Sequence, residues 1–350
     1  MNKKLSLSNF KVFNNANYWL LAPLVIIFVA LVCGTVYSTS GNKYDGFANV
    51  GIDFRGGTVL TVEIEAGPDM TGDNYEANEK IIKEIIEKNG GSPSDAQTRG
   101  TNAIIVRYPN SLNGENFNDD SKTLEMISIN NQIAKDVEAG FKERYGDDVE
   151  ITASAELINA TASSDLISKA ALSVSLAILL ILIYVIIRFD LFSGLAAIIA
   201  LIHDLIIMFA GVIILRIPIN SSLIAAIITI LAYSINNTII VFDRVRDYMK
   251  PLKTQKARID IAFIVDSSVK DTLNRSILTT ITTLITVTAL ACVGIQSLND
   301  FVIPIIIGLI AGAYSSVLIA PSVWGLMQKA KIKRKKKEKS EKAPVYSRSR

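Results

Sequence analysis

The sequence is poor in the residues that most enzyme and metal sites need. It contains one histidine and two cysteines among 350 residues. Cys33 and Cys292 both fall in long apolar stretches, which excludes a disulfide framework and a thiolate metal site. The sequence also has no Walker loop and no nucleophile elbow. We therefore expect no enzyme activity, no cofactor and no bound metal.

Charged side chains are almost absent from six long apolar runs, in a chain of which 50% is hydrophobic. A helix needs about 20 apolar residues to cross the hydrocarbon core of a bilayer, which is about 30 Å thick. Only the third run contains an acid or a histidine. The runs predict six membrane spans, at residues 18–36, 169–188, 191–215, 222–242, 275–295 and 301–325.

The basic residues indicate the orientation. Residues 1–17 carry three lysines and no acid, the loop 243–274 carries seven Lys or Arg, and the tail 326–350 carries eleven. Residues 37–168, in contrast, have a net charge of −12. Because basic flanks stay in the cytoplasm, we expect a multi-pass plasma-membrane protein with both termini inside and residues 37–168 outside. A cleaved signal peptide is an alternative for the first run, but its ~19 apolar residues exceed the usual 7–15, so we favour an uncleaved anchor.

The external segment 37–168 shows the periodicities of one compact α+β domain. Residues 59–64 alternate as a strand does, and 74–88 carry an isoleucine stripe at helical spacing. Short strands are predicted at 95–99, 103–108 and 149–157, and a second helix at 121–145. The order β-α-β-β-α-β is that of a ferredoxin-like unit.

Two segments outside the spans, one in the cytoplasmic loop and one in the basic tail, have a recognisable character. Residues 257–269 of the loop are amphipathic and suit the membrane surface. Residues 331–339 form a lysine run that we expect to be disordered. The run fits a topology anchor near anionic lipid, and a contact with ribosomal RNA or a partner protein is the alternative.

Polar side chains inside the predicted spans are the candidate site. His203 and Asp204 sit near the middle of the third span, where a charge costs roughly 2.5–3.5 kcal/mol on insertion scales. They form either a hydrogen-bonded pair that locks helices together or part of an ion pathway. Asn236 and Asn237 in the fourth span, and Arg275 at the start of the fifth, can lie at similar depth because these helices meet at the same membrane face.

Small residues in the sixth span predict a close helix contact. Gly308 and Gly312 are spaced as G-x-x-x-G and are followed by Ala313, Ser315 and Ser316. This spacing lets two helices pack tightly. The motif is common in membrane helices and indicates no particular function.

Several motifs, in order along the chain, resemble one family. After the first span comes a G-x-D-F-x-G-G signature, and Asp243 and Arg244 end a run in the fourth span that is similar to the same family. The family is the SecD/SecF export proteins, and the short external segment resembles its SecF branch. The signature consists of Gly51, Asp53, Phe54, Gly56 and Gly57.

The resemblance implies an auxiliary subunit of the Sec translocon with a helix bundle like that of RND transporters. Such a subunit works with SecD and the SecYEG channel on secreted preproteins, with YajC and YidC as further candidate partners. It contacts membrane lipid and no nucleic acid. The family is thought to use the proton gradient, or sodium in some members. The resemblance also implies an ion relay through Asp204, His203, Asn236, Asn237 and Arg275.

One departure from the family pattern bears on the mechanism. The fourth span of the family usually carries Asn-Asp where this chain has Asn236-Asn237, and an amide does not titrate near neutral pH. Three interpretations remain: an acid of SecD carries the proton, Asp204 takes over, or the chain is an uncoupled scaffold. Asn237 also offers an oxygen that a sodium ion accepts. A second departure lies at residues 154–164, where the family often has a Gly-Pro segment before its second span. The link between the external domain and that span is therefore expected to be built differently.

Three functions follow from these observations. The first is an ion-coupled export subunit, and the second is an uncoupled scaffold between SecD and the channel. The third is a small-molecule exporter, which leaves the G-x-D-F-x-G-G signature unexplained and has a small external domain for a drug-binding role.

Overall fold

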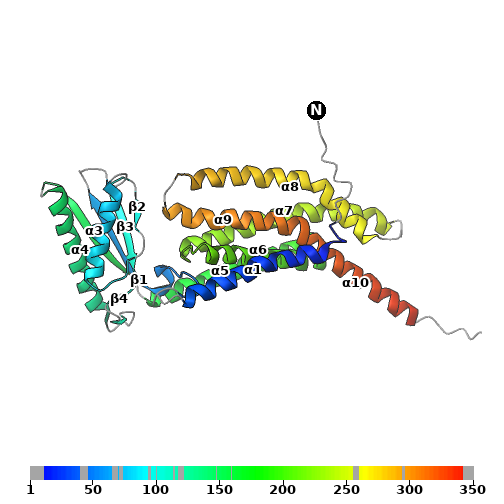
Figure 1. The fold of residues 1–350 in the computed structure, drawn as a ribbon. Helices are drawn as coiled ribbons and strands as arrows, with labels where there is room; N and C mark the ends of the chain where they lie inside the picture. Colours follow the sequence, from blue (N-terminus) through cyan, green and yellow to red (C-terminus); the bar gives the residue numbers. More distant parts are fainter. Residues whose placement is uncertain are drawn as a thin grey trace, which may run out of the picture.

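The structure, a computed structural model, describes residues 12–39, 46–64, 70, 74–93, 96–99, 101–112, 115–116, 122–146, 148–158, 160–254, 260–293 and 296–341. A small sheet domain lies at one end of a bundle of long helices (Figure 1). We call the opposite end, where the last helix leaves the bundle, the tail end.

Long apolar helices build the bundle. Six of the described helices are long and apolar enough to cross a membrane, so the chain is a multi-pass membrane protein with the predicted number of spans. The last span, 298–334, is the most deeply buried in the bundle, α6 and α7 are about half buried, and α5 lies almost entirely at the edge. The helices are α1 (Ala16–Thr39), α5 (Ala160–Arg188), α6 (Leu191–Ile214), α7 (Ser221–Thr254), α8 (Ile261–Ala291), α9 (Gln296–Tyr314) and α10 (Ala320–Glu341), with a π-helical segment η3 (Ser315–Ile319) between the last two.

Small side chains allow the central helices to approach closely. Ala196, Ala197 and Ala200 of α6 are fully buried in the core of the bundle. A Cβ atom on Gly308 of α9 would lie 2.6 Å from the side chain of Ile230 on α7. No side chain larger than hydrogen fits there without moving its neighbour, which agrees with the packing expected of small residues in membrane helices.

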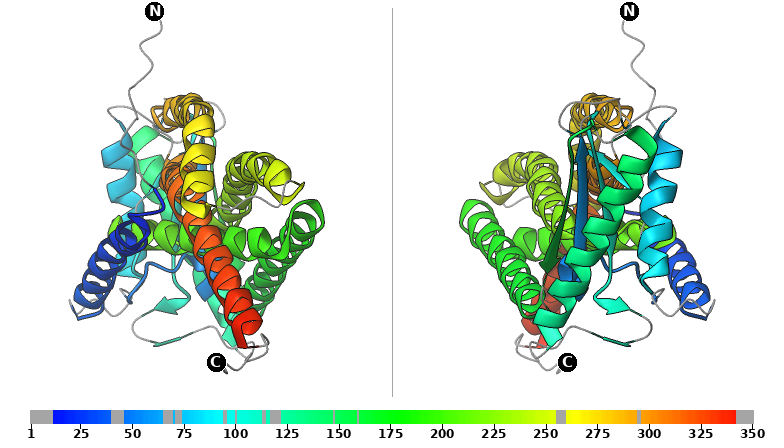
Figure 2. Two further views of the ribbon diagram at one scale, coloured as in Figure 1. Left: turned by 90° about the vertical axis from the view of Figure 1, so that its right-hand side faces the viewer. Right: turned by 90° about the vertical axis from the view of Figure 1, so that its left-hand side faces the viewer.

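The sheet domain has the predicted ferredoxin-like topology. Its sheet is antiparallel in the order β2-β3-β1-β6, and α3 and α4 cover one face of it (Figure 2). Leu60, Val62 and Ile64 of β1 point into the core beneath these helices, because alternate strand residues share a face. The elements are α2 (Ile52–Arg55), β1 (Gly57–Ile64), α3 (Tyr75–Lys88), β2 (Gln97–Arg99), β3 (Ala103–Tyr108), α4 (Thr123–Tyr145) and β6 (Ile151–Ile158), with a separate small pair β4 (Ser111–Leu112) and β5 (Glu115–Asn116).

The basic segments contain more helix than the sequence suggested. In the predicted loop 243–274, α7 continues to Thr254 and α8 begins at Ile261, while residues 255–259 lie outside the described residues. The disorder expected for 331–339 is wrong, because α10 runs to Glu341. Lysine is a good helix former, and a lysine-rich segment that continues an existing helix needs no new nucleus.

Candidate functional site

Asp204 is the centre of a polar cluster inside the bundle. Its side chain, in the middle of α6, is fully buried. Ser234 of α7 donates its hydroxyl to the Oδ2 atom of Asp204 at 2.5 Å, and Ser315 of η3 donates to the same atom at 2.9 Å. The Nδ1 atom of His203 lies 3.0 Å from Oδ1 of Asp204. Side chains from three different helical segments therefore meet on one carboxylate.

The backbone of the last span is shaped to reach this carboxylate. A Cβ atom on Gly312 of α9 would lie 3.1 Å from Cβ of Ser234 and 3.6 Å from Oδ2 of Asp204, so glycine allows the helices to meet here. Ser315 begins the π-helical segment η3. π-Helical turns occur mostly as single bulges inside α-helices and frequently at functional sites. The π-helical turn lies where a side chain of the sixth span contacts the buried acid.

His203 connects the cluster to the first helix. Its ring stacks on Tyr314 of α9, with the ring centroids 5.9 Å apart. The hydroxyl of Tyr314 donates to the backbone carbonyl of Trp19 in α1 at 2.8 Å. Among the described residues, Nε2 of His203 has no hydrogen-bond partner. A proton on His203 would pair directly with the charge of Asp204.

The structure does not bring all the predicted relay residues to this cluster. Asn236 is exposed on α7, whereas Asn237 is fully buried. Neither the Nδ2 nor the Oδ1 atom of Asn237 has a partner in the described part of the chain. Arg275 is exposed on α8, and no hydrogen bond or ion pair between described residues joins it to Asp204. Within the spans, α7 and α8 are linked by a hydrogen bond from the hydroxyl of Tyr233 to that of Thr280, at 3.3 Å.

The signature Gly51–Gly57 lies at the base of the sheet domain, where it binds the turn between α6 and α7. Oδ2 of Asp53 accepts the backbone N–H of Ser221 at 3.0 Å and its hydroxyl at 2.7 Å. The N–H of Gly51 donates to the carbonyl of Ile219 at 2.8 Å, and a Cβ atom at Gly51 would lie 3.0 Å from that oxygen. Asp53 thus supplies a carboxylate at the first residue of α7, where helices favour negative charge. We call these contacts the entry junction.

A second set of contacts reinforces the entry junction. Arg216, between α6 and α7, adopts a left-handed φ of 58°. Its guanidinium donates to the carbonyl of Gly46 at 2.9 Å and lies 4.7 Å from the ring centroid of Tyr37 in α1. The side chain of Asn49 donates to the carbonyl of Arg216 at 3.1 Å. The chain entering the sheet domain is therefore held to both α1 and the α6–α7 turn.

The remaining signature residues start the sheet. Gly56 has a φ of 78°, in the region that favours glycine. A Cβ atom on Gly57 would lie 2.9 Å from the carbonyl oxygen of Tyr108, so a larger residue would push β1 away from β3. Phe54 is half-buried in the short helix α2, which lies between Gly51 and Gly56. The signature therefore links the sheet domain to the membrane bundle.

Ion pairs tie helices together at the tail end. Asp243 of α7 lies 3.4 Å from the guanidinium of Arg188 at the end of α5. Arg244 pairs with Asp271 of α8 at 2.6 Å, and the hydroxyl of Tyr248 donates to the same carboxylate at 2.8 Å. All four charged side chains are partly exposed, so solvent screens both pairs. These pairs fix the relative positions of helices more than they stabilise the fold.

Sequence reasoning missed three participants. Ser315 and Tyr314 complete the Asp204 cluster, although the sequence indicated only a close helix contact at Gly312. Asp266 of α8 accepts the backbone N–H groups of residues 12 and 13 at 2.8 and 2.9 Å, and no local pattern indicates this contact. Among the residues that the structure describes, no group of three or more His, Cys, Asp or Glu is placed to hold a metal ion.

Comparisons with known proteins agree on one family. Residues 137–330 match the family described as "Protein export membrane protein SecD/SecF, C-terminal". The chain is 31% identical to the protein translocase subunit SecF of Rickettsia felis, over 82% of this chain and 84% of that protein. It is 34% identical to the protein translocase subunit SecDF of Bacillus subtilis, but the match spans only 34% of that longer protein.

A solved structure shares the fold. The SecDF of Thermus thermophilus, described as a translocon-associated membrane protein, matches with a TM-score of 0.65 and 26% identity. The match covers 92% of this chain and 38% of that one. The family model covers more than half of the chain, and the SecF relatives align with it over most of their length. Both comparisons give the same family. The chain therefore belongs to the SecD/SecF family of protein-export membrane proteins, and as a SecF-type member it serves protein export as an auxiliary translocon subunit.

Proposed function

We propose that this chain works beside a SecD subunit and the SecYEG channel in a bacterial cytoplasmic membrane, and that Asp204 carries a coupling proton. In this proposal both termini are cytoplasmic, the sheet domain is extracytoplasmic and acts on emerging preproteins, and YajC and YidC are further partners. The chain itself catalyses no reaction. The observation that carries the proposal is a fully buried carboxylate bonded to serines of two other helical segments.

The hydrogen bonds of Asp204 explain how a proton would change the bundle. The ionised carboxylate accepts both serine hydroxyls, which offsets part of its desolvation cost. A proton placed on Oδ2 itself would use one of the two lone pairs that accept these hydroxyls, so one of Ser234 and Ser315 would then have to turn or withdraw. Because these serines belong to α7 and η3, the proton changes contacts between the third, fourth and sixth spans.

The cost of a charge inside the membrane and the energy that the membrane potential supplies are of the same order. A charge at mid-span costs roughly 2.5–3.5 kcal/mol on insertion scales. Moving one charge through a potential of 100 mV supplies about 2.3 kcal/mol. The energy that one proton gains in crossing the membrane is therefore of the same order as the cost of a charge at the position of Asp204. The entry junction connects this change to the sheet domain, because Asp53 holds the first residue of α7, the helix that carries Ser234.

Partnership with SecD is supported by the exposed half of α8. Its fully buried residues end at Thr280, and the remaining turns up to Ala291 present exposed apolar side chains such as Ile281 and Ile285. The hydroxyls of Thr282 and Thr286 bond back to carbonyls of their own helix. Such a face suits lipid or an apolar partner helix, and the SecDF relatives join both subunits in one protein.

Replacing Asp204 by asparagine tests the coupling. The change keeps the shape of the side chain and removes its titration. We expect Asp204→Asn to lower preprotein export in cells to the level seen when the membrane potential is collapsed, at normal protein amounts. Ser322→Ala is the control, since Ser322 is equally buried on α10 and has no described contact with Asp204. Export that keeps its wild-type rate and its response to the potential in Asp204→Asn would refute the proposal.

The uncoupled scaffold is the second candidate. It is favoured by the amide at Asn237 and by the separation of the exposed Arg275 from the cluster. A scaffold predicts that Asp204→Asn is tolerated, while mutations on the exposed half of α8 abolish co-purification with SecD.

A further inference from the structure

The two oxygen atoms of the Asp204 carboxylate have different partners. Oδ2 accepts the hydroxyls of Ser234 and Ser315, which belong to α7 and η3. Oδ1 lies 3.0 Å from Nδ1 of His203, the preceding residue on α6. A proton on Oδ2 changes contacts with two other helical segments, whereas a proton on Oδ1 leaves both serines in place. The oxygen that takes the proton therefore determines whether the other helices respond.

The contact with Oδ1 indicates which nitrogen of His203 carries a proton. An ionised carboxylate only accepts hydrogen bonds, so Nδ1 is the donor in this pair. Nε2 is buried and, in the part of the chain that the structure describes, has no partner. An imidazolium would pair with the carboxylate, but it would also place a second N–H at Nε2 without an acceptor, which is costly for a charged group. The geometry therefore favours a neutral imidazole with its proton on Nδ1.

Neighbouring helices hold the imidazole in this orientation. The ring stacks on Tyr314 of α9 at an interplanar angle of 25°, and only 13% of the His203 side chain is exposed. The Tyr314 hydroxyl donates to the carbonyl of Trp19 in α1, which fixes the stacking partner in turn. The titratable groups that bond to or stack on the ring are Asp204 and Tyr314, and among the described residues no lysine or arginine pairs with Asp204. The position of Nδ1 beside Oδ1 is therefore set by packing as well as by the hydrogen bond.

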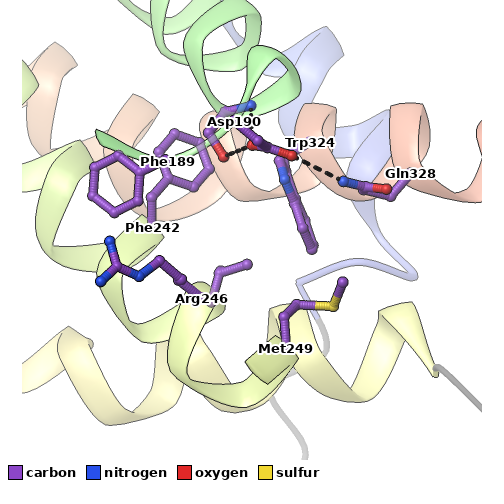
Figure 3. Close-up of a pocket in the computed structure, with 9 residues that line it drawn as sticks. Phe189, Asp190, Phe242, Arg246, Met249, Trp324 and Gln328 are labelled. Carbon is purple, nitrogen blue, oxygen red and sulfur yellow. Dashed lines mark hydrogen bonds between the residues drawn. The ribbon is translucent and has the colours of Figure 1, made fainter. Parts of the chain in front are cut away.

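Asp190, the acid that caps the start of α6, has a different arrangement (Figure 3). Its Oδ1 atom accepts the backbone N–H and the hydroxyl of Ser193, and its Oδ2 atom accepts the side-chain amide of Gln328 at 3.2 Å. It is half-buried beside a small cavity at the tail end, and the helix N-terminus favours its charge. Neither of its oxygens contacts a histidine, because the one histidine of the chain lies beside the acid inside the bundle.

The proton on Nδ1 leaves only one oxygen of Asp204 with an acceptor for a second proton. A protonated carboxyl is a donor and needs an acceptor of its own when it is buried. On Oδ1 the new O–H would face the Nδ1–H of His203, which is also a donor. On Oδ2 it would face serine hydroxyls, and a hydroxyl turns from donor to acceptor by rotating about its C–O bond. Of the described partners, only those of Oδ2 can satisfy the proton.

We propose that His203 directs the coupling proton of Asp204 to Oδ2. The inference rests on the proposed function, in which Asp204 carries that proton. The incoming proton forms an O–H bond at Oδ2, one serine hydroxyl turns to accept it, and the imidazole keeps its own proton throughout. His203 is therefore a positioning residue. Without its Nδ1–H, Asp204 can be protonated on Oδ1, and the contacts with α7 and η3 then stay unchanged.

Nitrogen NMR of the single histidine tests the protonation state of the ring. The sequence contains one histidine, so nitrogen-15 histidine labelling of the full-length protein reports the two ring nitrogens of His203 alone. The protein is purified through a tag without histidine and measured in lipid vesicles, at pH values above and below the titration of Asp204. We expect a neutral ring protonated at Nδ1 in both states. The Nε2–H form or an imidazolium in either state would overturn the proposal.

Infrared spectra and export measurements test the direction of the proton. The carboxyl band of protonated Asp204 is the band that Asp204→Asn removes. Asp190→Asn, which keeps the cap of α6, should retain this band. We expect His203→Asn, whose amide oxygen can accept a proton from Oδ1, to keep the band and to lose the response of export to the membrane potential.

The two measurements separate this inference from the proposed function. A folded His203→Asn that keeps both the band and the wild-type response to the potential would overturn the role of His203 and leave the role of Asp204 intact. Absence of any Asp204-dependent carboxyl band would refute the proposed function, and this inference with it. If His203→Asn fails to fold, the NMR measurement still decides, because it uses the wild-type chain.

Discussion

The carboxylate of Asp53 accepts both the backbone N–H and the hydroxyl of Ser221, although 168 residues separate them in the sequence. One residue belongs to the signature before the sheet domain, and the other begins the helix that carries Ser234 and Asn237. The signature therefore acts as a joint between the outer domain and the central helix. The contacts of Gly51 with Ile219 and of Asp53 with Ser221 give a physical reason for the Gly-x-Asp order in the signature.

Asp53→Ala should loosen that joint. The change removes the cap of α7, which is worth about 0.5–2 kcal/mol, and leaves the backbone bond of Gly51 to Ile219 and the contacts of Arg216 with Gly46 and Asn49. We expect faster protease cleavage at the base of the sheet domain and slower export, at near-normal protein levels. Glu156→Ala on the exposed face of β6 is the control and should leave both unchanged. Unchanged cleavage in Asp53→Ala would mean that the joint is held by other contacts.

The sequence predicts the architecture well because the governing forces act locally. Apolar runs of membrane length and the alternation in β1 follow from burial alone, and both are present in the structure. The Asp204 cluster was only partly predictable. His203 and Asp204 were found because polar residues in a span are rare, whereas Ser315 reaches the acid only through a π-helical turn. The placement of Arg275 away from the cluster depends on how α8 is rotated, which no local pattern records.

Asn237 should behave differently alone and in the complex. Its amide is fully buried and has no partner among the described residues, a state that costs about 1–3 kcal/mol. Asn237→Leu is therefore expected to raise the thermal stability of the isolated chain. The same change should weaken co-purification with SecD if the missing partner belongs to that subunit. Asn236→Leu, at the exposed neighbouring position, is the matched control. Destabilisation of the isolated chain by Asn237→Leu would show that the amide has a partner within it.

A buried network in the sheet domain gives a prediction about stability. The hydroxyl of Tyr108 donates to Asn130 at 2.9 Å, and Asn130 in turn donates to Thr58 at 2.7 Å. Burial raises the pKa of the Tyr108 hydroxyl above its usual value, so the group stays a donor at any ordinary pH. Tyr108→Phe leaves the Oδ1 atom of Asn130 buried without this donor, at a cost of about 1–3 kcal/mol.

Hydrogen exchange of the β1 and β3 amides measures this cost. We expect exchange in Tyr108→Phe to accelerate by about 5- to 150-fold, since protection in a sheet core follows its opening free energy. Glu156→Gln, on the open face of the sheet, should exchange as the wild type does. Equal exchange rates in Tyr108→Phe and the wild type would contradict a structural role for the network.

Removing one serine from the Asp204 cluster tests whether Asp204 carries a proton during export or only stabilises the bundle. Ser315→Ala takes away one of two hydroxyl donors to Oδ2, which makes the ionised form less favourable while the backbone of η3 is kept. If Asp204 carries a proton, the dependence of export on membrane potential should shift in Ser315→Ala and in Ser234→Ala alike, because both serines bind the same oxygen. Ser315→Thr, which keeps the hydroxyl, should restore most of the wild-type response. Ser322→Ala removes an equally buried hydroxyl outside the cluster and should have no effect. A shift of the same size in Ser322→Ala would assign the result to packing of the last span rather than to the buried acid.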